Sequence, residues 1–414
     1  MKLNLNPEGR RPVSYEVLPA APPAPPVRLA SLDQFRGYTV AAMVFVNFVG
    51  PLAAVHPTLK HHNDYCSYAD TIMPQFFLAV GFALRLTFQR RLEMAGSWVA
   101  YGRVLRRAVG LMLLGVVLYH FQHRYFTWAQ LVGDYEKLGL LGLLWKNVQA
   151  QTFQTLVHIG VATLWCLPVM GAGRSWLWIW LLLSGGLHLW LMSQAFWFNP
   201  PVIDPANPVI VNWFEFARTR PVIDGGAFGF LTWSIPMLLG AWASDMVRLL
   251  PARRSLAVLT GASMLFMAIG YGLSASGRLA AWWQGGVMQW PAPPFVPPWD
   301  RPPGLQGPWI EFWTMSQRVG TVSYQTFAAG FALAVFVVFR LLADGAKLRL
   351  GLFRTLGTNA LAAYLIHIAV IDCLQPITPR DAPLWFALSA AGLVLGVTWL
   401  FTRYLEKQGL YLRL

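Results

Sequence analysis

Ten apolar stretches, each close to the length needed to cross a bilayer, dominate the sequence and constrain what it can fold into. A transmembrane helix needs about 20 predominantly apolar residues. We expect spans at 32–54, 71–89, 104–121, 153–171, 175–195, 227–247, 255–275, 319–341, 355–374 and 384–402. The sequence therefore predicts an all-α fold, a polytopic membrane helical bundle with about ten transmembrane helices.

The composition supports a membrane protein and excludes other classes. Hydrophobic residues make up 56% of the chain and charged residues 12%, whereas a soluble domain carries about 25% charged residues. An ordinary soluble enzyme, a disordered chain and a fibre are excluded. The net charge of +14 fits basic cytoplasmic loops better than nucleic-acid binding. The lipid bilayer is the expected partner, and no nucleic acid is expected.

Basic residues predict the orientation. If the amino terminus lies inside the cell, most of the 32 lysines and arginines fall at inner helix ends, so both termini are expected to be cytoplasmic. The outer loops would then be 55–69, 122–152, 196–226 and 276–318. Residues 1–27 are predicted to be a disordered, proline-rich cytoplasmic tail. Residues 28–408 would form the transmembrane helical domain and 409–414 a short cytoplasmic tail.

The first outer loop carries the densest group of reactive side chains. His61, His62, Asp64 and Asp70 lie there between two predicted membrane helices. A histidine beside a carboxylate is held in one tautomer and can act as a general base. The histidines lack the ligand spacing of a zinc site, so no metal is expected.

The first predicted helix carries further polar groups. Ser31 and Gln34 have the spacing of a capping box, and Asp33 lies in the first turn, where the helix dipole favours an anion. Arg36, at the predicted inner face, could hold a phosphorylated cytoplasmic ligand. Asn47 lies at membrane depth, where a carboxamide is costly unless it faces protein or a cavity.

Several motifs, in order along the chain, resemble the heparan-α-glucosaminide N-acetyltransferase family, which belongs to a wider group of transmembrane acyltransferases. They are Ser31-Leu32-Asp33-Gln34-Phe35-Arg36-Gly37, Met43-Val44-Phe45-Val46-Asn47, Leu59-Lys60-His61, Ala69-Asp70, Pro74-Gln75-Phe76-Phe77, Arg106-Arg107 before a glycine-rich helix, Ile223-Asp224-Gly225-Gly226, and Leu356-Gly357-Thr358-Asn359 with Tyr364. The resemblance implies an acyltransferase-like domain that uses cytosolic acetyl-CoA to acetylate a terminal glucosamine on the far side of the membrane.

The resemblance also implies roles for residues. The family's asparagine and histidine fall on Asn47 and His61, although a longer spacing between them leaves His62 as an alternative. The expected catalytic residues are His61, His62, Asn47 and Asp70. The CoA phosphates would meet Arg36, Arg103, Arg106, Arg107 and Asn359. The acceptor would meet Asp33, Asp64, Asp224 and His367, the last of which shares a helix face with Asn359.

Other hypotheses remain open from the sequence. A polytopic transporter of a small polar or sugar-like substrate would use the same buried polar groups as a substrate path, and an inactive membrane scaffold is a third reading. Within the acyltransferase hypothesis, the acceptor could be an amine or a hydroxyl of a sugar or polysaccharide, and histidine could be a base or carry the acetyl group. A homodimer is possible. A bacterial inner membrane is the expected location.

Overall fold

The computed structural model describes residues 29–63, 65–120, 126–151, 153–194, 224–283 and 313–412, and the predicted tail 1–27 lies outside them. No strand occurs in these ranges. The α-helices are α1 (Ala30–Val49), α2 (Ile72–His120), α3 (Trp128–Gln151), α4 (Thr155–Met170), α5 (Arg174–Gln194), α7 (Phe230–Leu249), α8 (Ala252–Trp283), α9 (Val322–Phe339), α10 (Gly351–Thr358), α11 (Ala360–Leu374) and α12 (Leu384–Lys407). The all-α membrane fold is therefore confirmed.

All ten predicted spans fall on helices, but the count of ten is not confirmed. Within the described ranges, seven helices are long and apolar enough to cross a membrane. The predicted spans 71–89 and 104–121 both lie on α2, and 153–171 falls on α4, which has only 16 residues. The first predicted span falls on α1, which is not among the seven and whose first turns carry several polar side chains.

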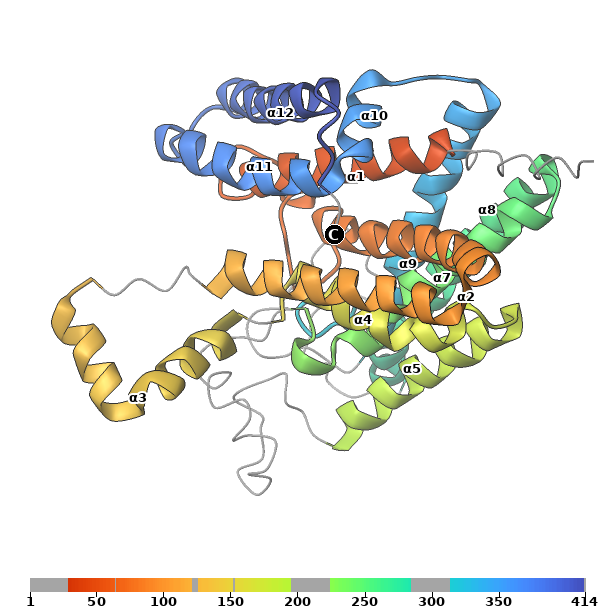
Figure 1. Cartoon of the computed structure of the whole chain (residues 1–414), viewed down its shortest axis with the longest axis horizontal. Helices are drawn as coiled ribbons and strands as arrows, with labels where there is room; N and C mark the ends of the chain where they lie inside the picture. The colour runs from red at the N-terminus through yellow and green to blue at the C-terminus, as the bar shows by residue number, and fades with distance from the viewer. Residues whose placement is uncertain are drawn as a thin grey trace, which may run out of the picture.

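A glycine divides the long helix α2 into two halves. Gly96 has φ 79° and ψ 171°, a conformation essentially restricted to glycine. The chain reverses there, and the two halves run back alongside each other (Figure 1). Phe88 in the first half meets Tyr101 in the second at a ring-centroid distance of 5.1 Å. The two halves of α2 are thus joined with almost no loop.

The helix ends define two ends of the bundle. Arg91 and Arg103, on either side of Gly96, lie close enough to interact electrostatically, and Arg107 interacts with both Arg36 and Arg91, so these four arginines lie at one end of the bundle. We call this the basic end. The opposite end holds the loop from residue 50 to 68, between α1 and α2, and we call it the histidine end. The cytoplasmic location of the basic end remains a prediction.

Glycines let the helices approach closely. A Cβ atom on Gly37 of α1 would lie 1.7 Å from the Phe353 carbonyl oxygen, and one on Gly357 of α10 would lie 1.7 Å from that of Asp33. Gly81 of α2 meets α7 at Met237 in the same way. Small residues at such positions are typical of helix contacts in membranes. These contacts fix α1, α2, α7 and α10, which carry much of the site described below.

A buried ion pair joins three helices near the basic end. Arg85 of α2 donates from Nη2 to Asp245 Oδ2 of α7 at 2.8 Å, and both side chains are almost fully buried. Its Nη1 donates to the carbonyl oxygens of Met170 and Ala172, at the end of α4, at 2.6 and 2.8 Å. Arg85 therefore satisfies both a buried carboxylate and the free carbonyls of a helix terminus.

We expect Arg85→Leu to lower the free energy of unfolding by about 3–5 kcal/mol, because it leaves the Asp245 carboxylate buried without its partner. Arg248 also contacts Asp245, at 3.6 Å, but its side chain is 42% exposed. Arg248→Ala is the matched control and should cost about 1 kcal/mol or less. Thermal unfolding of the two purified variants in detergent measures the difference, and equal effects would contradict the role given to Arg85.

Candidate active site

A histidine–carboxylate pair lies at the histidine end. His61 Nδ1 donates to Asp70 Oδ1 at 2.9 Å; the His61 side chain is 37% exposed, whereas that of Asp70 is fully buried. The pair is held between the loop and the short 3₁₀ helix Ala69–Thr71 that precedes α2. This hydrogen bond places the proton on Nδ1 and leaves the Nε2 lone pair free to accept a proton.

The Asp70 carboxylate also organises the surrounding loop. Asp70 Oδ2 accepts hydrogen bonds from the backbone N–H groups of His62 and Ser67, at 3.3 and 3.0 Å, and from Ser67 Oγ at 3.0 Å. Tyr324 of α9 donates to the Asp70 carbonyl oxygen at 2.6 Å. The Asp70 carboxylate therefore binds the loop that carries the histidines.

A second carboxylate lies close to His61. Asp224, in the Asp-Gly-Gly turn before α7, is buried and accepts a hydrogen bond from Gln317 Nε2 at 3.0 Å. The segment that carries Gln317 is tied to the histidine loop, because Arg318 N and Ser316 Oγ both donate to the Asn63 carbonyl oxygen at 2.9 Å. The first outer loop, the Asp224 turn and the residues before α9 therefore form one unit.

Burial and the neighbouring carboxylates shift the pKa values of His61 and Asp224. Burial alone would lower the pKa of His61, but the hydrogen bond and charge of Asp70 outweigh it, with smaller contributions from Asp224 and Gln317. The pKa of His61 is therefore raised above its ordinary 6.5. Burial raises the pKa of Asp224 to about 7, although the Gln317 hydrogen bond and the His61 charge act against this. His61 is a stronger base than a free histidine, as a proton acceptor requires.

The two histidines of the loop are placed differently. The His61 ring binds Asp70, whereas His62 contributes only its backbone N–H to that carboxylate. The buried Nδ1 of His62 has no hydrogen-bond partner among the described residues. The geometry therefore favours His61 over His62 as the acid–base group. Asp64, predicted to bind the acceptor, lies outside the described residues.

Asn47 belongs to a different polar pair. Its Nδ2 lies 3.5 Å from His367 Nε2 on α11, and His367 Nδ1 contacts the carbonyl oxygen of Tyr364. A carbonyl only accepts, so Nδ1 carries the proton and Nε2 accepts from Asn47. Asn47 is exposed between the buried Val46 and Phe48, so its amide faces open space. Its second N–H remains available for another acceptor.

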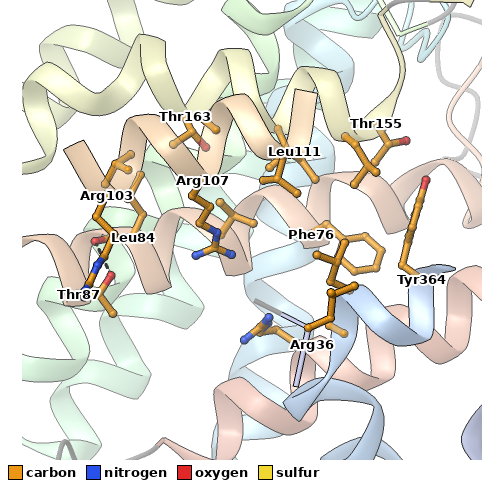
Figure 2. Close-up of a pocket in the computed structure, with 18 of the residues that line it drawn as sticks. Arg36, Phe76, Leu84, Thr87, Arg103, Arg107, Leu111, Thr155, Thr163 and Tyr364 are labelled. Carbon is orange, nitrogen blue, oxygen red and sulfur yellow. Dashed lines mark hydrogen bonds between the residues drawn. The ribbon is translucent and has the colours of Figure 1, made fainter. Parts of the chain in front are cut away.

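A cavity of about 370 Å³ runs along the inner surfaces of α1, α2, α4 and α11 (Figure 2). This volume lies within the ~300–1,000 Å³ typical of ligand pockets. Its charged lining is Arg36, Arg91, Arg103 and Arg107, and Figure 2 shows the Arg36 and Arg107 side chains extending into the same space. Apolar side chains and threonines form most of the remaining wall. We call it the arginine cavity.

The arginine cavity extends toward the histidine end. On the first half of α2 its lining runs from Arg91 to Phe76, which is about 22 Å along a helix axis. Phe76 lies only six residues after Asp70. Tyr364, whose carbonyl holds His367, lines the same end together with Thr155. The cavity thus runs from the arginine cluster to Phe76, Thr155 and Tyr364; of the described residues, its lining does not include His61, Asp70, Asn47 or His367.

The remaining predicted residues are placed elsewhere. Arg106 is exposed and does not line the arginine cavity, although Arg103 and Arg107 do. The Asn359 amide binds the backbone of Leu410 and Leu412 at 3.0 and 3.1 Å. It thereby positions Leu412, which lines the cavity. Asp33, predicted to bind the acceptor, lies at the basic end, far along α1 from Asn47.

Sequence reasoning did not single out Gln317, Ser67 or Tyr324. Gln317 lies in the polar run Ser316-Gln317-Arg318, just before the predicted span 319–341. Ser67 likewise lies a few residues before a predicted span, the one that begins at residue 71. A polar residue directly before a predicted span was therefore the sequence signal that could have identified Gln317 and Ser67. Within the described residues, no group of three or more histidine, cysteine, aspartate or glutamate side chains could hold a metal ion.

The fold is that of a multi-pass membrane protein, and it combines a partly exposed imidazole on a buried carboxylate with a cavity whose charged lining is arginine. Residues 28–275 match the family model of the heparan-alpha-glucosaminide N-acetyltransferase catalytic domain. That match covers more than half of the chain, so the chain belongs to this family, as its motifs predicted. Members of the family in general use acetyl-CoA as donor. No curated protein matches the chain.

We expect Asp70→Asn to lower the pKa of His61 below 6.5, because the charge that outweighs burial is removed and the desolvation remains. Histidine NMR titration of the folded variant, with His61 assigned by substitution, measures the change. Asp344→Asn is the control, because Asp344 binds Ser31 at the basic end. A pKa of His61 that is equal in the Asp70 variant and the control would contradict the pairing.

Proposed function

We propose that this protein transfers an acetyl group from cytosolic acetyl-CoA to an amino sugar or polysaccharide on the far side of the membrane. The single observation that carries this proposal is the arginine cavity, which leads from a cationic end to within two helical turns of a histidine–aspartate pair. A cytosolic donor and an acceptor in the opposite compartment need such a passage through the bundle.

The residues of the arginine cavity fit such a donor. CoA carries phosphates and a long, largely uncharged arm that ends in the thioester. Four guanidinium groups at one end of the cavity match the phosphates, since arginine binds phosphate through paired hydrogen bonds. The lining between them and Tyr364 includes Val80, Leu111 and Ile159, which suit the arm. The cavity would therefore direct the thioester toward the histidine end.

His61 would act as the general base. Its Nε2 accepts the proton of the attacking amine or hydroxyl as the acceptor adds to the thioester carbon, and it returns a proton to the departing CoA sulfur. Asp70 holds the ring and stabilises the imidazolium that forms in between. General-base catalysis of this kind contributes typically 10²–10⁴-fold. An acetylated His61 that accumulates without acceptor would indicate nucleophilic catalysis instead.

Asn47 would stabilise the charge that develops on the thioester oxygen. His367 fixes the orientation of the Asn47 amide, and the second N–H of that amide can donate to an oxyanion. Asp224 and Gln317 lie beside His61 and can contact the acceptor. A carboxyl group whose pKa is about 7 can bind an amine as its anion or a hydroxyl as its neutral form.

Radiolabelled acetyl-CoA outside inverted vesicles, with an amino sugar trapped inside, tests the proposed function directly. We expect acetylated sugar to accumulate in the lumen only when the protein is present. Uptake or release of unmodified sugar, without acetylation, would favour the transporter hypothesis. CoA binding without transfer would favour an inactive scaffold. Comparison of amine with hydroxyl acceptors distinguishes N- from O-acetylation.

We expect His61→Ala to lower kcat about 10²–10⁴-fold, because the base is lost, whereas His62→Ala should retain most of its activity. His62→Ala is the matched control, since it removes the neighbouring ring from the same loop and leaves the backbone hydrogen bond to Asp70. Initial rates of acetyl transfer by the two purified proteins measure the difference. Full activity in both variants would falsify the role of this loop.

A further inference from the structure

A second cavity lies at the basic end. Its volume is about 390 Å³, and it is lined by Ala30, Asp33, Gln34, Arg349, Arg354, Thr358 and Glu406. These residues come from the start of α1, the segment before α10, α10 itself and the end of α12. We call it the α1–α12 cavity.

Hydrogen bonds fix the walls of the α1–α12 cavity. Gln34 Nε2 donates to the Leu348 carbonyl oxygen at 3.0 Å, and Gln34 Oε1 accepts from Leu350 N at 2.9 Å. One amide thus holds the backbone on both sides of Arg349. Ser31 Oγ donates to Asp344 Oδ2 at 2.6 Å and anchors the same segment to α1. Arg349 is therefore positioned by the fold and not by a flexible loop.

The charges in the α1–α12 cavity are mixed. Arg349 and Arg354 supply two guanidinium groups, and Asp33 and Glu406 supply two carboxylates. Glu406 binds Arg403 at 2.6 Å and Thr355 Oγ1 at 2.8 Å, and its contact with Arg354 is longer, at 3.5 Å. The Glu406 charge is therefore met mainly by Arg403, which leaves Arg354 able to bind another anion.

The two cavities are neighbours. Thr358 lines both of them. Arg36 of the arginine cavity and Asp33 of the α1–α12 cavity lie three residues apart on α1, one turn of helix. A ligand that occupies the cationic end of one cavity therefore has a second site with its own arginines directly beside it.

We propose that the α1–α12 cavity binds the adenosine 3′-phosphate end of the donor, while the arginine cavity receives its diphosphate and arm. This inference rests on the proposed function. A 3′-phosphate is an anion that matches Arg349 and Arg354, and the adenine amino group and ribose hydroxyl are donors that match Asp33 and Glu406. The charged residues of this cavity have both signs, whereas those of its neighbour are arginines alone, so this cavity fits a ligand that carries both an anion and neutral donors.

Calorimetric titration of the full-length protein in detergent, with CoA and with 3′-dephospho-CoA, tests the assignment. We expect the wild type to bind CoA about tenfold more tightly, as one or two charge-assisted hydrogen bonds would provide. Arg349→Ala and Arg354→Ala should each weaken CoA binding about tenfold and leave 3′-dephospho-CoA within about twofold. Arg354→Gln, which retains most of the side chain, is a second variant should an alanine variant not fold.

Arg253→Ala is the control, because Arg253 is exposed near the start of α8 and lines neither cavity. Equal affinity of the wild type for both ligands, or equal weakening of both by the arginine variants, would overturn the subsite while the proposed function stands. Absence of binding by either ligand to the wild type would overturn the proposed function and the subsite together.

Discussion

The chemistry of the histidine end depends on one buried carboxylate. Asp70 has no exposure to water, and an unpaired charge in that position would be very costly. Three loop donors and the His61 ring compensate it. The same hydrogen bonds that make burial tolerable also fold the loop and hold the imidazole. The folding of this loop and the orientation of the His61 ring therefore have a single origin.

The two halves of α2, which meet at Gly96, connect Asp70 with the basic end of the molecule. Its first half begins beside Asp70, and both halves contribute walls to the arginine cavity. Because Gly96 reverses the chain within one helix, Arg91 and Arg103 meet at the basic end without an intervening loop. Arg85 of α2 also forms hydrogen bonds with Met170 of α4 and Asp245 of α7. The basic end and the histidine end are thus linked through the packed helices α2, α4 and α7.

Local sequence patterns predicted the features that depend on neighbouring residues in the chain, namely the positions of the helices and the residues of short motifs. Apolar run length located the helices, and the sequence pointed to the His61–Asp70 pair. Of the four predicted arginines, Arg36, Arg103 and Arg107 line one cavity, whereas Arg106 does not and Arg91, which does, was not predicted. Partners distant in the sequence were not predictable in this way. Ser31 and Gln34 have capping-box spacing, but that prediction was wrong: no side chain caps α1, and the two residues bind Asp344 and the backbone at Leu348 and Leu350. Ser31 and Gln34 therefore form hydrogen bonds with distant residues in place of the predicted capping box at the start of α1.

Gln317 illustrates the same difficulty at the site itself. It lies 93 positions from Asp224 and outside the region that matches the family model, so neither motif nor spacing pointed to it. Tyr324, Tyr364 and His367 also lie beyond that region. Each contacts a residue of the histidine end or lines the cavity that leads to it. The carboxy-terminal helices therefore complete the site that the matched region begins.

Several buried polar groups lie around Asp224 and His61, and others of the same kind lie elsewhere in the bundle. Buried polar groups in folded proteins are almost always hydrogen-bonded, and polar groups within membrane bundles are usually functional. His62 Nδ1 is buried without a hydrogen-bond partner among the described residues, and Gln317 and the fully buried His158 ring lie in the same part of the molecule. His158 lies against the Asp224 turn, since a Cβ on Gly229 would be 3.0 Å from its ring and 2.1 Å from the Asp224 carbonyl. These groups lie around Asp224 and His61, so the hydroxyl and amine groups of the acceptor proposed above would find hydrogen-bond partners there.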